Sequence, residues 1–282
     1  MTTYFVTGAT GFIGKRLVAR LLRRPETSAV YALVRETSRE RLAALSQGWA
    51  GAEKLRPVVG DLAEPRLGVD PAGFEHLDHV VHLGAVYDLT AGEEANRRAN
   101  VEGTRHLLAF AAAAGAGLVH HVSSIAVAGD QAGRFTEADF DLGQRFSSPY
   151  HATKFQAEKL VREQALPFRV YRPSAVVGDS RTGEMDKVDG PYFFLPAISR
   201  LAALPRRLPL AAPDLGATNL VPVDYVVDAM DFLMHRDAPS GSTYHLAAAR
   251  PQSLNSVYNA FARAAGGPVV RAALPARPSG VV

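Results

Sequence analysis

Short apolar runs alternate with segments of helical periodicity over the first 173 residues, and this alternation constrains the fold more than any other feature. The expected strands cover residues 3–8, 29–34, 55–60, 78–84, 117–124 and 168–173, and the expected helices cover residues 12–23, 38–46, 93–114 and 149–165. Strands that alternate with helices form βαβ units, whose strands lie parallel. The strands are nearly continuous apolar runs, which indicates a sheet covered by helices on both faces. The sequence therefore predicts an α/β protein with a Rossmann-type, doubly wound parallel sheet.

The pattern loosens after Pro173, where proline and glycine become frequent. We expect a dinucleotide-binding core with the catalytic residues over 1–172. A small, mostly helical substrate-binding region, interleaved with the last sheet strands, should cover 173–270. Residues 271–282 resemble a linker, which suggests that a second reductase module follows in a longer protein.

Composition excludes several classes of protein. Hydrophobic residues make up 47% of the 282 residues and charged residues 21%, as in ordinary soluble domains. No cysteine is present, so disulfides and cysteine-bound metals are excluded. A net charge of +3 without a Lys/Arg run gives no reason to expect a nucleic acid partner. No signal peptide and no apolar stretch of about 18 residues is found, so we expect a cytoplasmic protein without a transmembrane segment.

A glycine-rich turn follows the first strand. The segment "TGATGFIG" places glycines at 8, 11 and 14, directly before an amphipathic helix. Glycines at this spacing let a backbone approach a pyrophosphate closely and present the positive end of the helix to it. A Gly-rich structural turn is the alternative interpretation, but the strand–turn–helix context favours dinucleotide binding.

The residue after the second strand indicates which dinucleotide binds. Sites for NAD usually carry an acid here, to hold the ribose 2′-hydroxyl. This chain has Arg35, whose guanidinium can pair with the 2′-phosphate of NADP(H), with Arg39 and Lys15 as candidate helpers. A solvated surface arginine is the alternative. The full set of expected cofactor contacts is Gly8, Thr10, Gly11, Phe12, Ile13, Gly14, Arg35, Asp61, Leu62, Gly84, Ala85, Tyr150, Lys154, Pro173 and Val176.

Three residues are candidates for the chemistry. Ser124 follows the fifth strand, at the carboxyl edge where open α/β sheets bind their ligands. Lys154 follows Tyr150 by four positions at the start of the next helix, so the two residues share one face. A lysine ammonium near a tyrosine favours the phenolate and brings proton transfer closer to neutral pH.

The segments "TGATGFIG", "VSSIAVAG", "SPYHATK" and "YRPSAVVG" resemble the extended short-chain dehydrogenase/reductase family over residues 3–246. The later segments "RPSAVVGDSRTGEMDKVDGPYFF" and "TNLVPVDYVVDAM" resemble its fatty acyl-CoA reductase and thioester-reductase branch. By this resemblance Tyr150 is the general acid, Lys154 its partner and Ser124 a second donor to the substrate oxygen. The expected substrate is a fatty acyl thioester, on coenzyme A or an acyl carrier protein, or a fatty aldehyde, reduced with NADPH. Expected substrate contacts are Ser123, Tyr87, Tyr192 and Phe193.

Other interpretations remain open from the sequence. A sugar-nucleotide epimerase/dehydratase or a 3β-hydroxysteroid-type dehydrogenase shares several of these motifs, and a non-enzymatic cofactor-binding sensor is a third class. Arg200, Arg206 and Arg207 could meet coenzyme A phosphates or an acidic carrier protein. The histidines of "HLDHVVH" alternate in direction along a strand, so we expect no metal site. The sequence is compatible with a homodimer.

Overall fold

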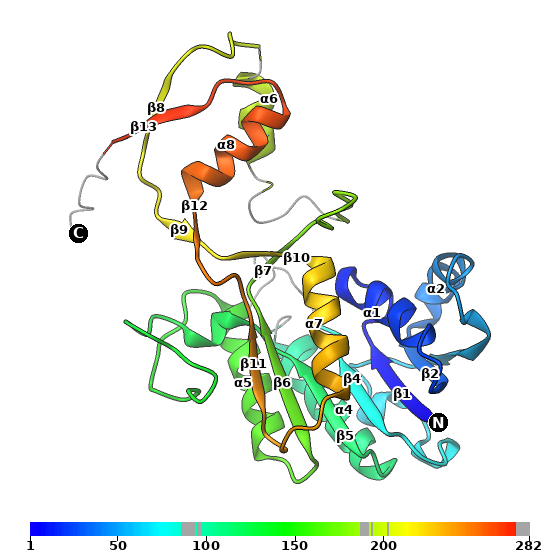
Figure 1. Cartoon of the computed structure of the whole chain (residues 1–282). Coiled ribbons are helices and arrows are strands. Elements are labelled where there is room, and N and C mark those ends of the chain that lie inside the picture. The colour runs from blue at the N-terminus through cyan, green and yellow to red at the C-terminus, as the bar shows by residue number, and fades with distance from the viewer. Residues whose placement is uncertain (86–93, 95–96, 187–191, 193, 202, 275–282) are drawn as a thin grey trace. The chain divides into compact units, whose positions relative to one another are not determined.

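The structure is a computed structural model of the chain and describes residues 1–85, 94, 97–186, 192, 194–201 and 203–274 (Figure 1). The chain forms two compact units. The first unit comprises Met1–Ser174 and Val223–Leu246, and the second comprises Ala175–Pro222 and Ala247–Val282. Residues 223–246 return to the first unit, and they lie within the stretch 173–270 that was expected to interleave with the last sheet strands.

In the described part of the first unit, seven strands form one parallel sheet in the order β11-β6-β5-β4-β1-β2-β3. The strands are β1 (Thr2–Thr7), β2 (Thr27–Val34), β3 (Leu55–Val59), β4 (His79–His82), β5 (Leu118–Val122), β6 (Phe168–Pro173) and β11 (Thr243–Leu246). The chain runs outward from β1 to β3 and then returns to β4 on the other side of β1. Ligands of such sheets bind where this reversal occurs, at the carboxyl ends of β1 and β4. The Rossmann-type prediction is confirmed.

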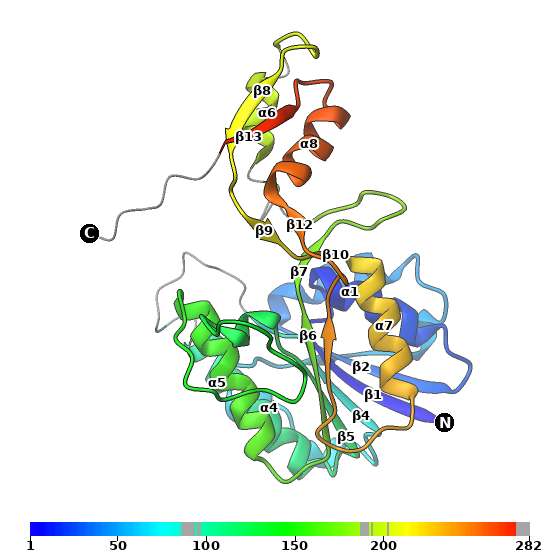
Figure 2. The ribbon, with the colours of Figure 1, turned by 60° about the vertical axis from the view of Figure 1, so that its left-hand side comes forward.

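Helices cover both faces of this sheet. The helices are α1 (Phe12–Leu22), α2 (Arg39–Ser46), α4 (Gly103–Ala113), α5 (Pro149–Glu163) and α7 (Val223–His235). The short helical turns are η1 (Glu36–Ser38), η2 (Ala52–Lys54), η3 (Pro65–Gly68), η4 (Pro71–Gly73), η5 (Arg97–Glu102) and η6 (Ile125–Ala128). The pair α4 and α5 lies on one face and the pair α1 and α7 on the other (Figures 1 and 2).

Apolar spacing explains why these helices pack where they do. Helix α1 buries Leu17, Val18, Leu21 and Leu22, which recur at intervals of three and four residues and so share one stripe. On the sheet, Phe5 of β1 is fully buried, and its ring centroid lies 4.5 Å from that of Phe110 on α4. Burial of each such side chain stabilises the fold by roughly 1.5–3 kcal/mol.

The second unit contains more strand than its proline and glycine content predicts. Its elements are β7 (Ala175–Val177), α6 (Leu195–Leu201), β8 (Leu210–Pro213), β9 (Ala217–Thr218), β10 (Leu220–Pro222), β12 (Gln252–Ser253), α8 (Leu254–Ala264) and β13 (Val270–Leu274). The strands pair as β7 with β10, β9 with β12, and β8 with β13. Residues 271–274 were expected in a linker-like tail, but they belong to β13, because the distant β8 supplies backbone partners.

No helix in the described ranges combines the length and apolar character that a membrane crossing requires.

Candidate active site

The glycine turn brings two loops of the first unit into contact. Gly8 has φ +73°, a left-handed conformation that side chains disfavour, and a Cβ there would lie 2.8 Å from the backbone nitrogen of Gly84. A Cβ on Gly14 would lie 2.0 Å from the carbonyl oxygen of Gly8. Glycine at these positions therefore permits the close packing of the turn after β1 against the loop after β4 and against α1.

Helix α1 begins with its first amide groups directed at this turn. Gly11 is the N-cap, no side chain caps the helix, and the first turn contains no acidic residue. The N–H groups and the positive end of the helix dipole are thus available to an anion such as a pyrophosphate. This observation fits a dinucleotide.

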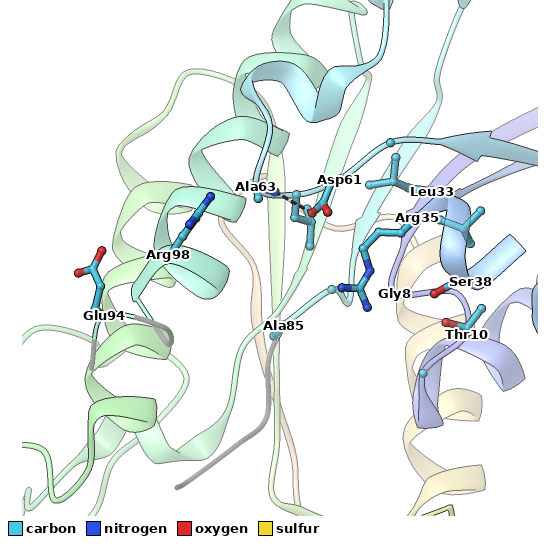
Figure 3. A pocket seen from close by; sticks show the side chains of 15 residues that line it. Gly8, Thr10, Leu33, Arg35, Ser38, Asp61, Ala63, Ala85, Glu94 and Arg98 are labelled. Atoms are coloured by element: carbon cyan, nitrogen blue, oxygen red, sulfur yellow. Dashed lines mark hydrogen bonds between the residues drawn. The ribbon is translucent and has the colours of Figure 1, made fainter. Parts of the chain in front are cut away.

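A cleft of about 750 Å³ opens beside the glycine turn (Figure 3). Eight of its lining residues were predicted as cofactor contacts: Gly8, Thr10, Gly11, Arg35, Asp61, Leu62, Gly84 and Ala85. The other lining residues are Leu33, Val34, Ser38, Gly60, Ala63, Glu94 and Arg98. The cleft lies at the carboxyl ends of β1, β2, β3 and β4, so it occupies the expected position at the reversal of strand order.

The described lining carries two arginines and two acids, and Arg35 places a positive charge at the end of β2. Arg35 is exposed, and its side chain projects into the cleft between Asp61 and the glycine turn (Figure 3). Arg98 of η5 also reaches the cleft, a contribution that the sequence reasoning missed because no motif marks it. The Asp61 carboxylate accepts a hydrogen bond from the Ala63 backbone N–H at 3.0 Å and so holds the loop in place.

The remaining predicted cofactor residues lie at several places. Phe12, Ile13 and Gly14 form the first turn of α1, and Gly14 is buried beneath the glycine turn. Pro173 is buried at the end of β6, and Val176 lies on β7 of the second unit. Of the proposed helpers, Arg39 pairs with Glu36 at 3.6 Å, and neither Arg39 nor Lys15 is among the described lining residues of the cleft.

Helix α5 carries the tyrosine and the lysine on its buried face. The Ser148 hydroxyl caps the helix by accepting a hydrogen bond from the His151 N–H at 3.3 Å, and Pro149 occupies the first turn. The buried positions are Tyr150, Thr153, Lys154, Ala157, Glu158 and Val161. This spacing places Tyr150 and Lys154 one turn apart on the stripe that packs inward.

The Lys154 ammonium is tied to the end of strand β5. Its Nζ donates a hydrogen bond to the Val122 carbonyl oxygen at 2.7 Å. The side chain is buried, and this burial lowers the pKa of Lys154 to about 8, although the nearby charge of Glu158 acts in the opposite direction. An ammonium group of this kind is still mostly charged at neutral pH.

Ser124 lies two residues beyond Val122 and is half-buried. Its hydroxyl oxygen accepts a hydrogen bond from the Ala126 N–H at 3.1 Å and so caps η6, the turn against which α5 packs. Because the oxygen is the acceptor in this bond, the Ser124 proton can still be donated to a substrate oxygen. Ser123 is buried instead, and its backbone N–H continues the pairing of β5 with β6 by donating to the Tyr171 carbonyl oxygen.

The predicted substrate contacts are placed only in part. Tyr192 lies in the second unit, where its hydroxyl accepts a hydrogen bond from the Gly178 N–H at 3.0 Å. Tyr87 and Phe193 lie outside the described residues. No group of three or more metal-ligating side chains occurs among the residues that the structure describes.

A family model described as Male sterility protein matches residues 6–230. A linear gramicidin synthase of Brevibacillus parabrevis is 32% identical over 263 residues, which cover 86% of this chain and 5% of that protein. The isonitrile lipopeptide synthase of Streptomyces coeruleorubidus is 32% identical over 275 residues, 90% of this chain and 18% of that protein. The chain thus spans less than a fifth of either relative.

Two solved structures are similar to the whole chain. The terminal R domain from the myxalamid PKS-NRPS biosynthetic pathway superposes with a TM-score of 0.81 and 32% identity, covering 96% of this chain and 72% of that one. A thiolation-reductase di-domain from an archaeal non-ribosomal peptide synthetase gives a TM-score of 0.78, with 95% and 77% coverage, but its 19% identity shows the fold alone. The chain therefore belongs to the male sterility protein family, in the thioester-reductase-like branch of the extended short-chain dehydrogenases/reductases, and is an oxidoreductase with a nicotinamide cofactor site.

Proposed function

We propose that the chain uses NADPH to reduce an acyl thioester carried on a phosphopantetheine arm to an aldehyde. The observation that carries the proposal is the combination of two features in the first unit. One is a dinucleotide cleft with Arg35 where NAD sites usually carry an acid. The other is the presence of Ser124, Tyr150 and Lys154 at the carboxyl edge of the same sheet.

The residues of the cleft have separable tasks in this proposal. The glycine turn and the amino end of α1 hold the pyrophosphate, and Arg35 pairs with the 2′-phosphate. When bound, the cofactor supplies the hydride. Lys154 holds the nicotinamide ribose and keeps a positive charge one turn away from Tyr150.

Tyr150 and Ser124 act on the substrate carbonyl oxygen. As negative charge develops on that oxygen, the Ser124 hydroxyl donates a hydrogen bond and Tyr150 donates a proton. The product of a thioester is a hemithioacetal, which expels the thiol and leaves an aldehyde. An aldehyde substrate gives an alcohol with the same residues, so the pair serves both reductions.

The relatives favour a carrier-bound thioester over free fatty acyl-CoA. Several of them are synthases of peptides or lipopeptides, and a solved structure at 32% identity is the terminal R domain from a PKS-NRPS biosynthetic pathway. We therefore place an acyl or peptidyl chain on a carrier protein first among the substrates, and a fatty acyl-CoA or fatty aldehyde second.

A substrate panel tests this proposal. The purified chain is given NADPH together with carrier-bound acyl thioesters, acyl-CoAs and aldehydes of graded length, and a nucleotide sugar as the competing class. We expect NADPH oxidation with the thioesters and aldehydes and none with the sugar. Tyr150→Phe should lose at least about a hundredfold in kcat while retaining NADPH binding. Near-normal turnover by Tyr150→Phe, or turnover of the nucleotide sugar alone, would reject the proposal.

A further inference from the structure

A continuous series of buried hydrogen bonds runs through His82, the last residue of β4. His82 is 3% exposed, and its two ring nitrogens face two threonines. Its Nδ1 lies 2.8 Å from the Thr7 hydroxyl at the end of β1, and its Nε2 lies 3.0 Å from the Thr104 hydroxyl on α4. The histidine thus joins a strand that leads into the glycine turn to a helix on the other side.

The direction of each bond follows from counting protons. The Thr104 hydroxyl lies 2.6 Å from the Asn100 carbonyl oxygen, which can only accept a hydrogen bond. Thr104 therefore donates its single hydroxyl proton to that oxygen. Thr104 must then accept from His82, which places the proton of the imidazole on Nε2. Nδ1 is consequently the acceptor for the Thr7 hydroxyl, and the Thr7 oxygen accepts in turn from the Gly84 backbone N–H at 3.0 Å.

The neutral ring that this arrangement requires is also the form that burial favours. Burial, with a smaller contribution from the positive charge of Lys154, lowers the pKa of His82 to about 3. A charged ring would carry protons on both nitrogens and would face the Thr7 hydroxyl with a donor instead of an acceptor. The single neutral tautomer therefore orders the hydrogen bonds on both sides.

The series continues from Thr104 to the catalytic helix. The Asn100 side-chain amide donates to the Thr153 hydroxyl at 3.2 Å, and that hydroxyl donates to the Tyr150 carbonyl oxygen at 3.0 Å. Gly84 lines the cofactor cleft, and Tyr150 lies in the first turn of α5. The two ends of the series are thus the edge of the cofactor site and the backbone of the candidate proton donor.

We propose that His82, as the Nε2-protonated neutral tautomer, is a positioning residue that fixes Tyr150 relative to the cofactor loop through Thr7 on one side and Thr104 on the other. The inference rests on the proposed role of Tyr150. Its two halves have different consequences. The hydrogen bonds through Thr7 hold Gly84 in place and so affect cofactor binding. The hydrogen bonds through Thr104 hold α5 in place and so affect the chemical step.

Two substitutions separate these halves. In His82→Gln the amide nitrogen can occupy the place of Nε2 and keep the donor to Thr104, while the acceptor for Thr7 is lost. In His82→Asn the amide oxygen can occupy the place of Nδ1 and keep the acceptor, while the donor to Thr104 is lost. We expect His82→Gln to raise the Kd for NADPH several-fold at nearly unchanged kcat, and His82→Asn to lower kcat about tenfold or more at nearly unchanged Kd.

A second pair of substitutions, both at Thr104, tests the connection from His82 to α5 without altering the histidine. Thr104→Val keeps the side-chain shape but removes the hydroxyl, and we expect kcat to fall by about the same factor as in His82→Asn. Thr104→Ser retains the hydroxyl and should restore most of the lost kcat. This pair decides the matter if the His82 variants do not fold.

His120 supplies the matched control. It is also fully buried on an adjacent strand, and its nitrogens lie 2.9 Å from His79 and 2.9 Å from the Tyr171 hydroxyl, a series that does not include α5. His120→Gln should lose stability, read as the urea midpoint, without the fall in kcat. The proposal is overturned if Thr104→Val keeps normal kcat, or if His120→Gln loses as much kcat as His82→Asn. Tyr150→Phe, run in parallel, keeps the two ideas apart, because its continued turnover rejects the proposed function itself.

Discussion

The Nζ atom of Lys154 lies 2.7 Å from the carbonyl oxygen of Val122, so helix α5 is bonded to the strand that ends just before Ser124. The bond joins α5 to β5 across the sheet face and fixes the position of a buried positive charge. It also identifies a conflict between function and stability, since burial of an ammonium group costs free energy that one hydrogen bond only partly offsets.

Lys154→Met should therefore stabilise the protein at pH 7 while it removes activity. The folded-state pKa of about 8 lies below the usual value of 10.5, so the charged form is disfavoured by folding. We expect the free energy of unfolding to rise by about 1–3 kcal/mol in the variant, with kcat reduced at least a hundredfold. Urea denaturation monitored by circular dichroism measures the first quantity.

The lowered pKa of Lys154 also determines how the stability difference between Lys154→Met and wild type depends on pH. Between pH 8 and 10.5 the unfolded chain binds a proton at Lys154 that the folded chain has released, so wild-type stability gains up to about 1.4 kcal/mol per pH unit from this group. The advantage of Lys154→Met should shrink over that interval. A variant that is less stable than wild type at pH 7 would contradict this account.

Arg35→Asp should reverse the cofactor preference. The substitution removes the cation at the end of β2 and introduces the acid that NAD sites usually carry there. A charged hydrogen-bonded pair contributes about 1.5–3 kcal/mol, so KM for NADPH should rise roughly 10- to 100-fold while KM for NADH falls or stays unchanged. Arg39→Asp is the control, because Arg39 begins α2 four positions after Arg35 but is not among the lining residues of the cleft. Equal KM changes in the two variants would argue against the role of Arg35.

Glu158→Gln should destabilise the fold without acting on the chemistry directly. Glu158 and Arg172 are both fully buried and lie 2.7 Å apart, and Arg172 also donates to the Asp139 carbonyl oxygen. Burial alone would raise the pKa of Glu158, but the hydrogen bonds and charge of Arg172 outweigh it and leave that pKa below its usual range. Removal of one partner from a buried pair costs about 3–5 kcal/mol.

The neighbouring Lys159 gives a direct comparison for this pair. Its ammonium lies 3.3 Å from Asp141, and both side chains are nearly half exposed. Lys159→Gln should change the free energy of unfolding by less than about 1 kcal/mol, because exposed pairs contribute little. Thermal and urea unfolding of the two variants side by side measure the contrast, and similar losses in both would refute it.

Residues whose positions follow from local sequence patterns could be placed from the sequence alone. The places of Gly8 and Arg35 beside the cleft follow from the ends of strands, and helical spacing puts Tyr150 and Lys154 on one buried face of α5. Arg98 could not be predicted from the sequence, because it belongs to η5 and reaches the cleft only through the tertiary fold, and no sequence motif marks it. The bonds of His82 to Thr7 and Thr104 depend likewise on which strands become neighbours in the sheet.

The short strands of the second unit were even harder to predict from the sequence. Strands of two or three residues, such as β9 and β7, form only because distant segments pair with them, and their own residues carry no strand pattern. The expectation of a linker over residues 271–282 was wrong for β13 for this reason, because "VRAAL" has no alternation that would mark a strand. Tertiary pairing decided these elements.

Buried histidines should make the protein sensitive to mild acid. Burial lowers the pKa of His79 to about 4 and that of His82 to about 3, and it lowers the pKa of His121 well below its usual range. Below pH 6.5 the unfolded chain binds protons that the folded chain does not, so stability falls as pH falls. Each such histidine contributes a loss of about 1.4 kcal/mol per pH unit until its folded pKa is reached.

His121→Leu should remove one of these contributions. Neither ring nitrogen of His121 has a hydrogen-bond partner among the described residues, so the substitution loses little at pH 7.5 and should stabilise the fold in acid. We expect the slope of unfolding free energy between pH 6.5 and 5 to decrease by about 1.4 kcal/mol per unit. Burial and the charge of Lys154 both lower the pKa of His121, and its ring adjoins that of His82. An unaltered slope in His121→Leu would contradict this account, because it would show that the folded protein protonates the His121 ring as readily as the unfolded chain does.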